Sequence, residues 1–403
     1  MANDLASVAE NITFFGQEVL SQLKVNLVAV NTVRRDYRGA ASAAGSIVQV
    51  PTIDILGSPT ERAIGAALTP TDLGSAYFNV TMVQIIQAIK IDSLQRMFEN
   101  VDTWMEAAGR LGYKLAKAAD KKVLDLWYKV PYRTGDVDGT ALFDGTNDID
   151  YLADATRILV GNAAPIEPGR MHVLLNAREA YNIRKLASYK NAYQAGSAAG
   201  RTSGLLGNIL GWDLHETQQV SNAPNIIAND DVSLTVTGAH SKGATSLVLG
   251  AAGTGTMRKG QILSIAGVTN EAGNPVGFSV QADAAISANA VTVTIFPPLP
   301  KALAGSDVVT LSATGTTAVP SENLAYHGDF ALFVARPERP LTAGGVNTYT
   351  AADPDTGLSV RFSTEARTVG GSGDAMMEYL TGSLCVGVDV VRPDLAVRLE
   401  GQT

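Results

Sequence analysis

The alternation of apolar and polar positions is clearest in a block at residues 229–323. Apolar residues recur two apart there, as in Val291, Val293 and Ile295, which is the period of a β-strand. Clusters of Gly, Asn and Pro separate the runs. We predict a small six-stranded barrel or sandwich inserted into another domain, so that its two flanks form one domain. The six runs are residues 232–236, 246–249, 261–265, 276–280, 291–296 and 308–311.

An unusually long strand pattern lies in the first quarter of the chain. Residues 46–51 predict one strand, about 24 Gly- and Pro-containing residues follow, and residues 77–91 predict a second strand. Fifteen strand residues at about 3.3 Å each would span roughly 50 Å, whereas typical strands end near ten residues. We interpret 46–92 as a β-ribbon arm that buries its apolar faces on another molecule.

Helical periodicity is strongest directly after this arm. Apolar residues from Trp104 to Leu126 follow three- and four-residue spacing, interrupted at Lys122. Asn100 or Thr103 can cap the helix, and Pro131 ends it. Before the arm, only residues 14–25 predict a helix, and the rest of the N-terminal segment reads as irregular.

The remaining segments alternate between helix and strand. We predict helices at 148–160 and 177–187 and a strand at 171–175, and residues 205–215 lead into another strand. After the block, residues 329–334 predict a strand, and a loose stretch reaches Gly357. Strands at 358–362 and 383–391 follow. The fold class expected is therefore α+β.

Composition narrows the function classes. A net charge of −8 argues against a dedicated nucleic-acid binder, which would carry a basic stripe. The single cysteine, Cys385, excludes an intramolecular disulfide or a Cys-rich zinc site, and we expect it to be buried as a small apolar residue. No signal peptide and no apolar run of about 20 residues is apparent. We therefore expect a protein without membrane association, made in a cytoplasm.

Candidate catalytic groups do not form a recognisable set. The four histidines are His172, His215, His240 and His327, and none has a second histidine or a carboxylate at metal-ligand spacing in the sequence. A Gly-x-Ser-x-Gly nucleophile motif is absent from the sequence. We expect the histidines to be structural or solvent-facing, and we predict no catalytic, cofactor-binding or metal-binding residue, hence no enzyme and no cofactor.

Three other clusters have simple structural explanations. The glycine-rich stretch 250–255 follows a strand but lacks the Lys of a phosphate-binding loop, so we interpret it as a turn. Aspartates gather within residues 136–150 without the spacing of a calcium loop, and Asp148 or Asp150 can cap the next helix. Arg34, Arg35 and Arg38 form either a solvated face or a contact with an acidic partner or enclosed nucleic acid. The aspartates are Asp136, Asp138, Asp144, Asp148 and Asp150.

The order of these elements resembles the major capsid proteins of tailed bacteriophages, which have the Hong Kong 97-type fold. Three local stretches carry the resemblance: GSIVQVP at 45–51, LGNILGW at 206–212 and VRPDLA at 391–396. The inserted block, with KGQILSIAGV at 259–268, is similar to the short-tailed Salmonella-phage branch, whose coat protein has an inserted β-domain.

The resemblance implies a domain map. It comprises an N-terminal arm (1–45), an extended β-ribbon loop (46–92), a spine helix of the peripheral domain (93–131), an axial domain (132–228 and 324–370), an inserted β-domain (229–323) and C-terminal strands (371–403).

The resemblance also implies a structural role without chemical turnover. Copies would assemble as pentamers and hexamers into an icosahedral shell in the host cytoplasm. A scaffolding protein would guide assembly, a portal would occupy one vertex, and double-stranded DNA would be enclosed without sequence-specific binding. A decoration protein is a further candidate partner. Two alternatives stay open: an encapsulin-like nanocompartment shell protein, and an α/β enzyme with an accessory β-domain.

Overall fold

The computed structural model places the chain in two compact units. Unit 1 comprises residues 1–25, 35–116 and 333–389, and unit 2 comprises residues 26–34, 117–332 and 390–403. The residues that the structure describes are 5–35, 45–53, 75–92, 101–135, 141–144, 149–186, 206–220, 234–251, 255–270, 273–311, 321–338, 346–353, 358–368 and 376–401.

Unit 1 is built around a five-stranded sheet in which one long strand, β20, is the centre. β20 pairs with β19 on one edge and with β3 on the other, so its fifteen residues hold strands from distant parts of the sequence. The sheet consists of β3 (Val83–Asp92), β17 (Ala331–Arg336), β18 (Val346–Ala352), β19 (Ser359–Thr368) and β20 (Met376–Val390).

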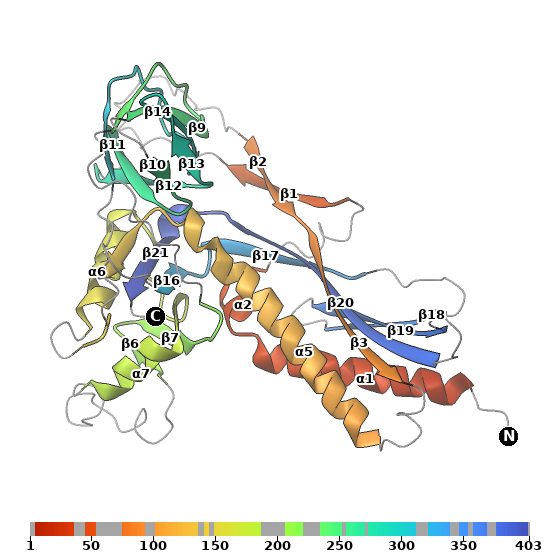
Figure 1. Cartoon of the computed structure of the whole chain (residues 1–403). Coiled ribbons are helices and arrows are strands. Elements are labelled where there is room, and N and C mark those ends of the chain that lie inside the picture. Colours follow the sequence, from red (N-terminus) through yellow and green to blue (C-terminus); the bar gives the residue numbers. More distant parts are fainter. Residues whose placement is uncertain are drawn as a thin grey trace, which may run out of the picture. The chain divides into compact units, whose positions relative to one another are not determined.

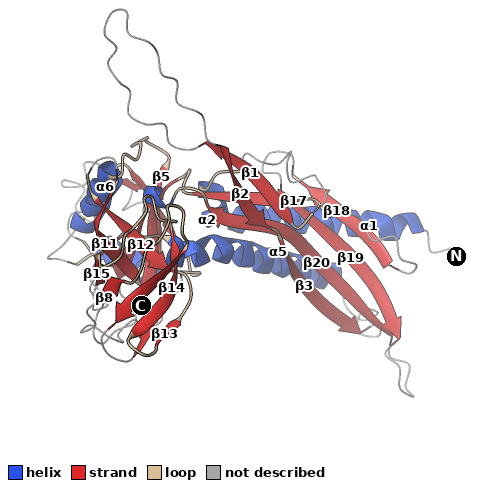
Figure 2. Cartoon of the chain, turned by 90° about the horizontal axis from the view of Figure 1, so that it is seen from above, coloured by secondary structure: helices blue, strands red, loops and turns tan. Residues whose placement is uncertain are grey.

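Helices α1 (Leu5–Asn26) and α5 (Val101–Leu124) lie against this sheet (Figure 2). A Cβ atom at Gly382 of β20 would press on the side chain of Leu111, and one at Gly16 of α1 would press on the rings of Tyr349 and Phe362. The two helices also touch each other, because a Cβ at Gly112 would lie 2.6 Å from the carbonyl oxygen of Val19. Glycine therefore permits the close packing that three contacts in this unit require.

A two-stranded ribbon precedes β3. Strands β1 (Ile47–Ile53) and β2 (Ser75–Thr81) pair antiparallel with each other, and the strand is interrupted only at Met82 before β3 begins. The single long strand predicted at 77–91 is therefore two strands. The prediction was wrong at Met82 because β2 pairs with β1, whereas β3 pairs with β20. The alternation of apolar residues along a sequence does not show where a strand changes its pairing partner.

Unit 2 contains a mixed six-stranded sheet in the order β4-β21-β16-β5-β7-β6. The pairs β5–β7 and β21–β4 are parallel, and the other pairs are antiparallel. Its strands are β4 (Arg133–Gly135), β5 (Met171–Leu175), β6 (Asn208–Ile209), β7 (Trp212–Glu216), β16 (Ser321–His327) and β21 (Ala396–Gly401). Its helices are α2 (Ala29–Thr32), α6 (Asp150–Gly161), α7 (Ala177–Lys185) and the 3-10 turns η1 (Asp125–Lys129) and η2 (Pro393–Leu395).

The segment α2 is held in unit 2 by a buried carboxylate. Asp120 of α5 accepts hydrogen bonds from the backbone N–H groups of Val28 (2.8 Å) and Val30 (3.0 Å), at the start of α2. Burial raises the pKa of Asp120 to about 6, and the backbone hydrogen bonds oppose that shift. Thr32 adds a 2.5 Å contact with the hydroxyl of Tyr326.

Strands within residues 234–311 form a closed six-stranded barrel (Figure 1), which confirms the six strands predicted there, whereas Ser321 to Asn323, at the end of the predicted block, belong to β16 of the six-stranded sheet. Phe278, Leu247 and Val293 are fully buried in its core. A two-stranded sheet, β10–β13, was not predicted. The barrel strands are β8 (Leu234–Val236), β9 (Ser246–Ala251), β11 (Ile262–Thr269), β12 (Pro275–Val280), β14 (Ala290–Phe296) and β15 (Val308–Leu311), and the small sheet contains β10 (Gly255–Met257) and β13 (Ala284–Ile286).

Several predicted elements change in extent. The helix expected at 14–25 runs over Leu5–Asn26, and α5 begins at Val101, so Thr103 lies inside it and does not cap it. Strand β18 occupies part of the stretch expected to be loose. Residues 333–338, 346–353 and 358–368 belong to unit 1, whereas the domain map groups 324–370 with 132–228. None of the described helices is long and apolar enough to cross a membrane.

Candidate functional site

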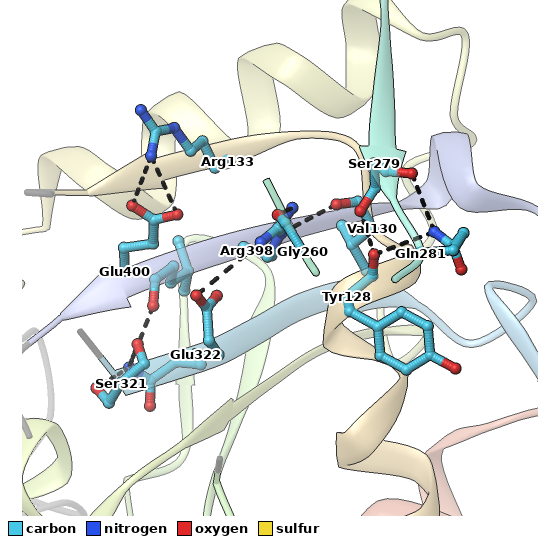
Figure 3. Close-up of polar contacts among 12 residues, drawn as sticks. Tyr128, Val130, Arg133, Gly260, Ser279, Gln281, Ser321, Glu322, Arg398 and Glu400 are labelled. Carbon is cyan, nitrogen blue, oxygen red and sulfur yellow. Dashed lines mark hydrogen bonds and ion pairs between the residues drawn. The ribbon is translucent and has the colours of Figure 1, made fainter. Parts of the chain in front are cut away.

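The barrel meets the six-stranded sheet at a set of polar contacts, which we call the barrel seam (Figure 3). The seam comprises Arg398, Glu322, Glu400 and Arg133 of the sheet, residues 127–131 after α5, and Gly260, Gly277, Ser279 and Gln281 of the barrel. It forms where the long helix ends, since α5 tightens into η1 and the chain then becomes extended at Val130 before Pro131.

Arg398 is the central residue of the seam. Its side chain is fully buried in β21. Its Nε donates a 2.9 Å hydrogen bond to the carbonyl oxygen of Val130, and its Nη2 donates a 2.7 Å hydrogen bond to the carbonyl oxygen of Gly260. The guanidinium also lies 5.5 Å from the ring centroid of Trp127. One side chain therefore connects the sheet, the end of the long helix and the barrel.

A buried carboxylate faces this guanidinium. Glu322 Oε1 lies 3.9 Å from Arg398 Nη1, and both side chains are fully buried. Neither oxygen of Glu322 has a hydrogen-bond partner among the described residues. Burial raises the pKa of Glu322 well above its ordinary value; Arg398 opposes the shift and Glu400 adds to it. Glu400 itself pairs with Arg133 at 3.0 Å.

Glycines let the barrel backbone approach the helix end closely. Gly260 has φ +87°, and a Cβ there would overlap the ring of Trp127. A Cβ at Gly277 would overlap the carbonyl oxygen of Pro131. Ser279 donates a hydrogen bond to the carbonyl oxygen of Tyr128. At Gly260 and Gly277 the barrel backbone packs directly against the Trp127 ring and the Pro131 carbonyl group. A residue larger than glycine would prevent these contacts.

A second contact joins the barrel to helix α6. Asn274 Nδ2 donates a 2.7 Å hydrogen bond to the carbonyl oxygen of Gly161, the last residue of α6, and Asn270 Nδ2 donates to the same oxygen at 3.2 Å. These amides satisfy a carbonyl group that has no partner within the helix. The barrel is thus attached at two places.

The β1–β2 ribbon is the second candidate site. One face of it carries Val48, Val50 and Val80, which are at most 3% exposed. The other face carries Ile47, 51% exposed, and Tyr77, 67% exposed. A ribbon with apolar side chains on its open face exposes area that association with another molecule would remove from water.

The histidines are not all isolated. His172 of β5 and His215 of β7 are neighbours, with His172 Nδ1 and His215 Nε2 3.4 Å apart, and Asp213 Oδ2 lies 4.0 Å from His172 Nδ1. Sequence spacing missed this because parallel pairing of β5 with β7 brings the three residues together. Burial lowers the pKa of His172 to about 4 and also lowers the pKa of His215.

The structure offers no metal set from these residues. Within the described parts of the chain, no three histidine, cysteine, aspartate or glutamate side chains converge to hold a metal ion. His327 is buried in β16 and lies 3.7 Å from Asp329 through Nδ1, and His240 lies apart in the barrel. The imidazoles of His172 and His215 lie close enough to share a hydrogen bond, and Asp213 flanks them.

The structure places three other residues that the sequence analysis singled out. Cys385 is half-buried instead of fully buried, and burial raises the pKa of its thiol. Arg34 donates backbone hydrogen bonds to the carbonyl oxygens of Gly328 and Ala331. Asp150 begins α6, so it is not the residue before the helix that would cap it. Asp136, Asp138, Asp148, Arg38 and Asn100 lie outside the described residues.

The glycine-rich stretch 250–255, predicted to be a turn, overlaps two strands. Gly250 and Ala251 are the last residues of β9, and Gly255 is the first residue of β10. Residues 252–254 lie outside the described residues.

The sequence did not point to the residues of the seam. Trp127, Gly260 and Arg398 lie in three separate segments, and only the fold brings them together. One weak signal existed. Arg398 interrupts an apolar strand, Ala396–Gly401, and a charged residue inside a strand buried on both faces needs a partner.

Comparisons with known proteins place the fold. No protein-family model and no curated protein matches the chain. A solved structure of Mycobacterium phage Che8 has a TM-score of 0.50 at 16% identity, covering 93% of this chain and 90% of that chain. The capsid structure of the cyanophage P-SCSP1u has a TM-score of 0.48 at 13% identity, covering 93% and 87%. The capsid of Ralstonia phage GP4 has a TM-score of 0.47 at 11% identity, covering 93% and 89%.

The likeness to the Che8 structure shows a shared fold over nearly the whole chain. The chain is therefore a mixed α/β protein that contains a closed six-stranded barrel and shares its fold with a phage structure.

Proposed function

We propose that the chain is a structural shell subunit, the major capsid protein of a tailed bacteriophage, whose copies assemble into an icosahedral shell around double-stranded DNA. The observation that carries the proposal is the open face of the β1–β2 ribbon, with Ile47 and Tyr77 exposed. A lone chain gains nothing from such a face, whereas a chain that associates with copies of itself buries it. The fold shared with the Che8 structure supports the same role.

The domain map belongs to this proposal. The ribbon and β3 correspond to the extended loop, α5 to the spine helix, and the six-stranded sheet to the axial domain. The barrel is the inserted β-domain of the short-tailed Salmonella-phage branch. Because residues 333–389 belong to unit 1, we assign strands β18 to β20 to the peripheral side of the subunit.

The proposed partners follow from the same role. Copies of the chain form pentamers and hexamers, a scaffolding protein guides their assembly in the host cytoplasm, and a portal occupies one vertex. Packaged DNA is enclosed without sequence-specific binding, which fits the net charge of −8. A decoration protein on the outer face is a further candidate.

The barrel seam suggests how the inserted domain contributes. Arg398, Gly260 and Trp127 fix the barrel against the sheet, and Asn274 fixes it against α6. A domain attached at two points transmits force to its host, whereas a tethered domain would move independently. We therefore propose that the barrel is a rigid part of the subunit.

Two alternatives predict different results. An encapsulin-like shell protein would assemble around a cargo enzyme whose gene lies beside its own, in place of genes for a portal and a terminase. An α/β enzyme would stay a small species and turn over a substrate.

The test is assembly in a bacterial host. The chain is expressed with and without the scaffolding protein encoded beside it, the lysate is fractionated on a sucrose gradient, and the fast fraction is imaged by negative-stain electron microscopy. Closed icosahedral particles of this chain support the proposal. A monodisperse monomer under every condition would contradict it, and particles filled with a co-purified enzyme would favour the nanocompartment.

A further inference from the structure

The hairpin formed by β6 and β7 contains an unusual turn residue. Ile209 pairs with Trp212, so Leu210 and Gly211 form a two-residue turn, with φ +52° and φ +84°. Two-residue hairpin turns of this kind need positive φ at both positions, which Asn, Asp and Gly supply at little cost. Leu210 does not, because its Cβ crowds the following carbonyl oxygen.

Leu210 differs from every comparable residue in the described chain. The other described non-glycine residues with positive φ are all small or polar: Ala163, Ala288, Asn289 and Ser306. Leu210 is also 54% exposed, so packing within the subunit does not offset its strain. A bulky apolar residue that is both strained and exposed points to a function outside the subunit's own stability.

The turn is held firmly from both sides. Asn208 Oδ1 accepts a 3.2 Å hydrogen bond from the backbone N–H of Gly211, and Asn208 Nδ2 donates a 2.9 Å hydrogen bond to Asp213 Oδ1. Trp212 is buried and donates from its indole nitrogen to Thr156 Oγ1 at 2.9 Å. The backbone that carries Leu210 is therefore held in place, which reduces the backbone entropy lost on binding.

We propose that Leu210 is an apolar anchor that inserts into the surface of a second copy of this chain. The inference rests on the proposed function, since shell assembly supplies the second copy. β6 is the edge strand of its sheet but is only two residues long, so this edge offers little backbone for strand addition. The contact is therefore made by the side chain. A tip on one copy and a different surface on the next form a heterologous contact, the kind that builds rings.

The test uses substitutions with opposite expected effects on folding and assembly. Leu210→Asn removes the anchor and relieves the strain, so the unassembled subunit should melt about 2 °C higher, while the concentration needed for assembly should rise about tenfold or more. Leu210→Met keeps an apolar anchor and should assemble like the wild type. Ala288→Gly is the matched control, because it relieves the same backbone strain at an exposed turn of the barrel and should leave assembly unchanged.

The outcomes separate the two claims. Wild-type assembly together with unimpaired assembly of Leu210→Asn would overturn this inference and leave the proposed function standing. A lower melting temperature of Leu210→Asn would assign the residue to folding, which also overturns the inference. Failure of the wild type to assemble would overturn the proposed function, and this inference with it.

Discussion

The barrel and the β1–β2 ribbon are both made of short strands, and they treat their apolar residues in opposite ways. The barrel closes on itself, so its strands have no free edge, and Phe278, Leu247 and Val293 are fully buried inside it. The ribbon has two strands and leaves Ile47 and Tyr77 exposed on one face. The barrel buries its apolar residues within one chain, whereas the ribbon leaves two apolar side chains exposed that, in the proposed function, another molecule covers.

Because of this difference, substitutions in the barrel should affect the stability of the subunit, and substitutions on the ribbon should affect its assembly. A substitution in the barrel core should unfold part of the subunit, because all of the stabilising contacts lie within one chain. A substitution on the open face of the ribbon should leave the subunit folded, because the contacts it removes form only between chains.

The largest expected effect is in the barrel core. Phe278→Ala should destabilise the subunit by about 3–5 kcal/mol, through lost burial and the cavity left behind. Chemical denaturation followed by circular dichroism measures it. Val308→Ala, at a position 57% exposed on β15, is the control and should change stability by less than about 0.5 kcal/mol. Equal effects of the two substitutions would mean that the barrel core is not the source of its stability.

The seam should respond next most strongly. Gly260→Ala adds a Cβ at φ +87° that overlaps the Trp127 ring, and we expect a loss of about 2–4 kcal/mol from backbone strain and overpacking. Gly273→Ala is the matched control, since Gly273 has φ +82° and nothing lies within 4 Å of its added Cβ.

Gly273→Ala should lose only the stability that the backbone strain costs, about 1–2 kcal/mol. The difference between the two midpoints in a urea titration therefore measures the packing at the seam. Equal losses would show that the barrel is not held against Trp127.

A smaller effect is expected from pH. The pKa of His172 is about 4 in the fold against an ordinary 6.5, so the unfolded chain takes up a proton first as the pH falls. The stability that neutral His172 contributes is present above pH 6.5 and is lost as the pH falls to about 4, by at most roughly 3 kcal/mol. Asp120 acts in the opposite direction, because its pKa of about 6 lies above its ordinary 3.8.

Substitution separates these two contributions. His172→Gln should flatten the loss of stability between pH 6.5 and 4, and His240→Gln should not. Melting temperatures measured across this range check the prediction. An unchanged slope in His172→Gln would show that the environment of His172 in the fold does not disfavour its protonation. The groups that surround His172 are His215, Asp213, His327, Arg170 and Tyr326.

The sequence predicted the barrel strands well because their apolar and polar residues alternate cleanly. The exceptions are β10 and β13, which have three residues each and too few positions to show a period. Strands β19 and β20 are longer than predicted, since their pairing with each other and with β3 extends them past the apolar runs.

The candidate site could not be predicted in the same way. The seam depends on Trp127, Gly260 and Arg398, which are more than a hundred residues apart in sequence and meet only after folding. The pairing of His172 with His215 likewise depends on the parallel register of β5 and β7. The ribbon was predicted as an arm, but its break at Met82 was not, because that break reflects a change of pairing partner.

The most direct measurement of the central claim compares folding and assembly of a ribbon double variant, Ile47→Ser with Tyr77→Ser. Analytical ultracentrifugation gives the assembled fraction of variant and wild type at the same concentration, and thermal melting gives the stability of the unassembled subunit. We predict that melting changes by no more than about 2 °C, while the fast-sedimenting shells of the wild type are lost. A variant that forms shells as readily as the wild type, with Ile47 and Tyr77 both replaced, would contradict the account.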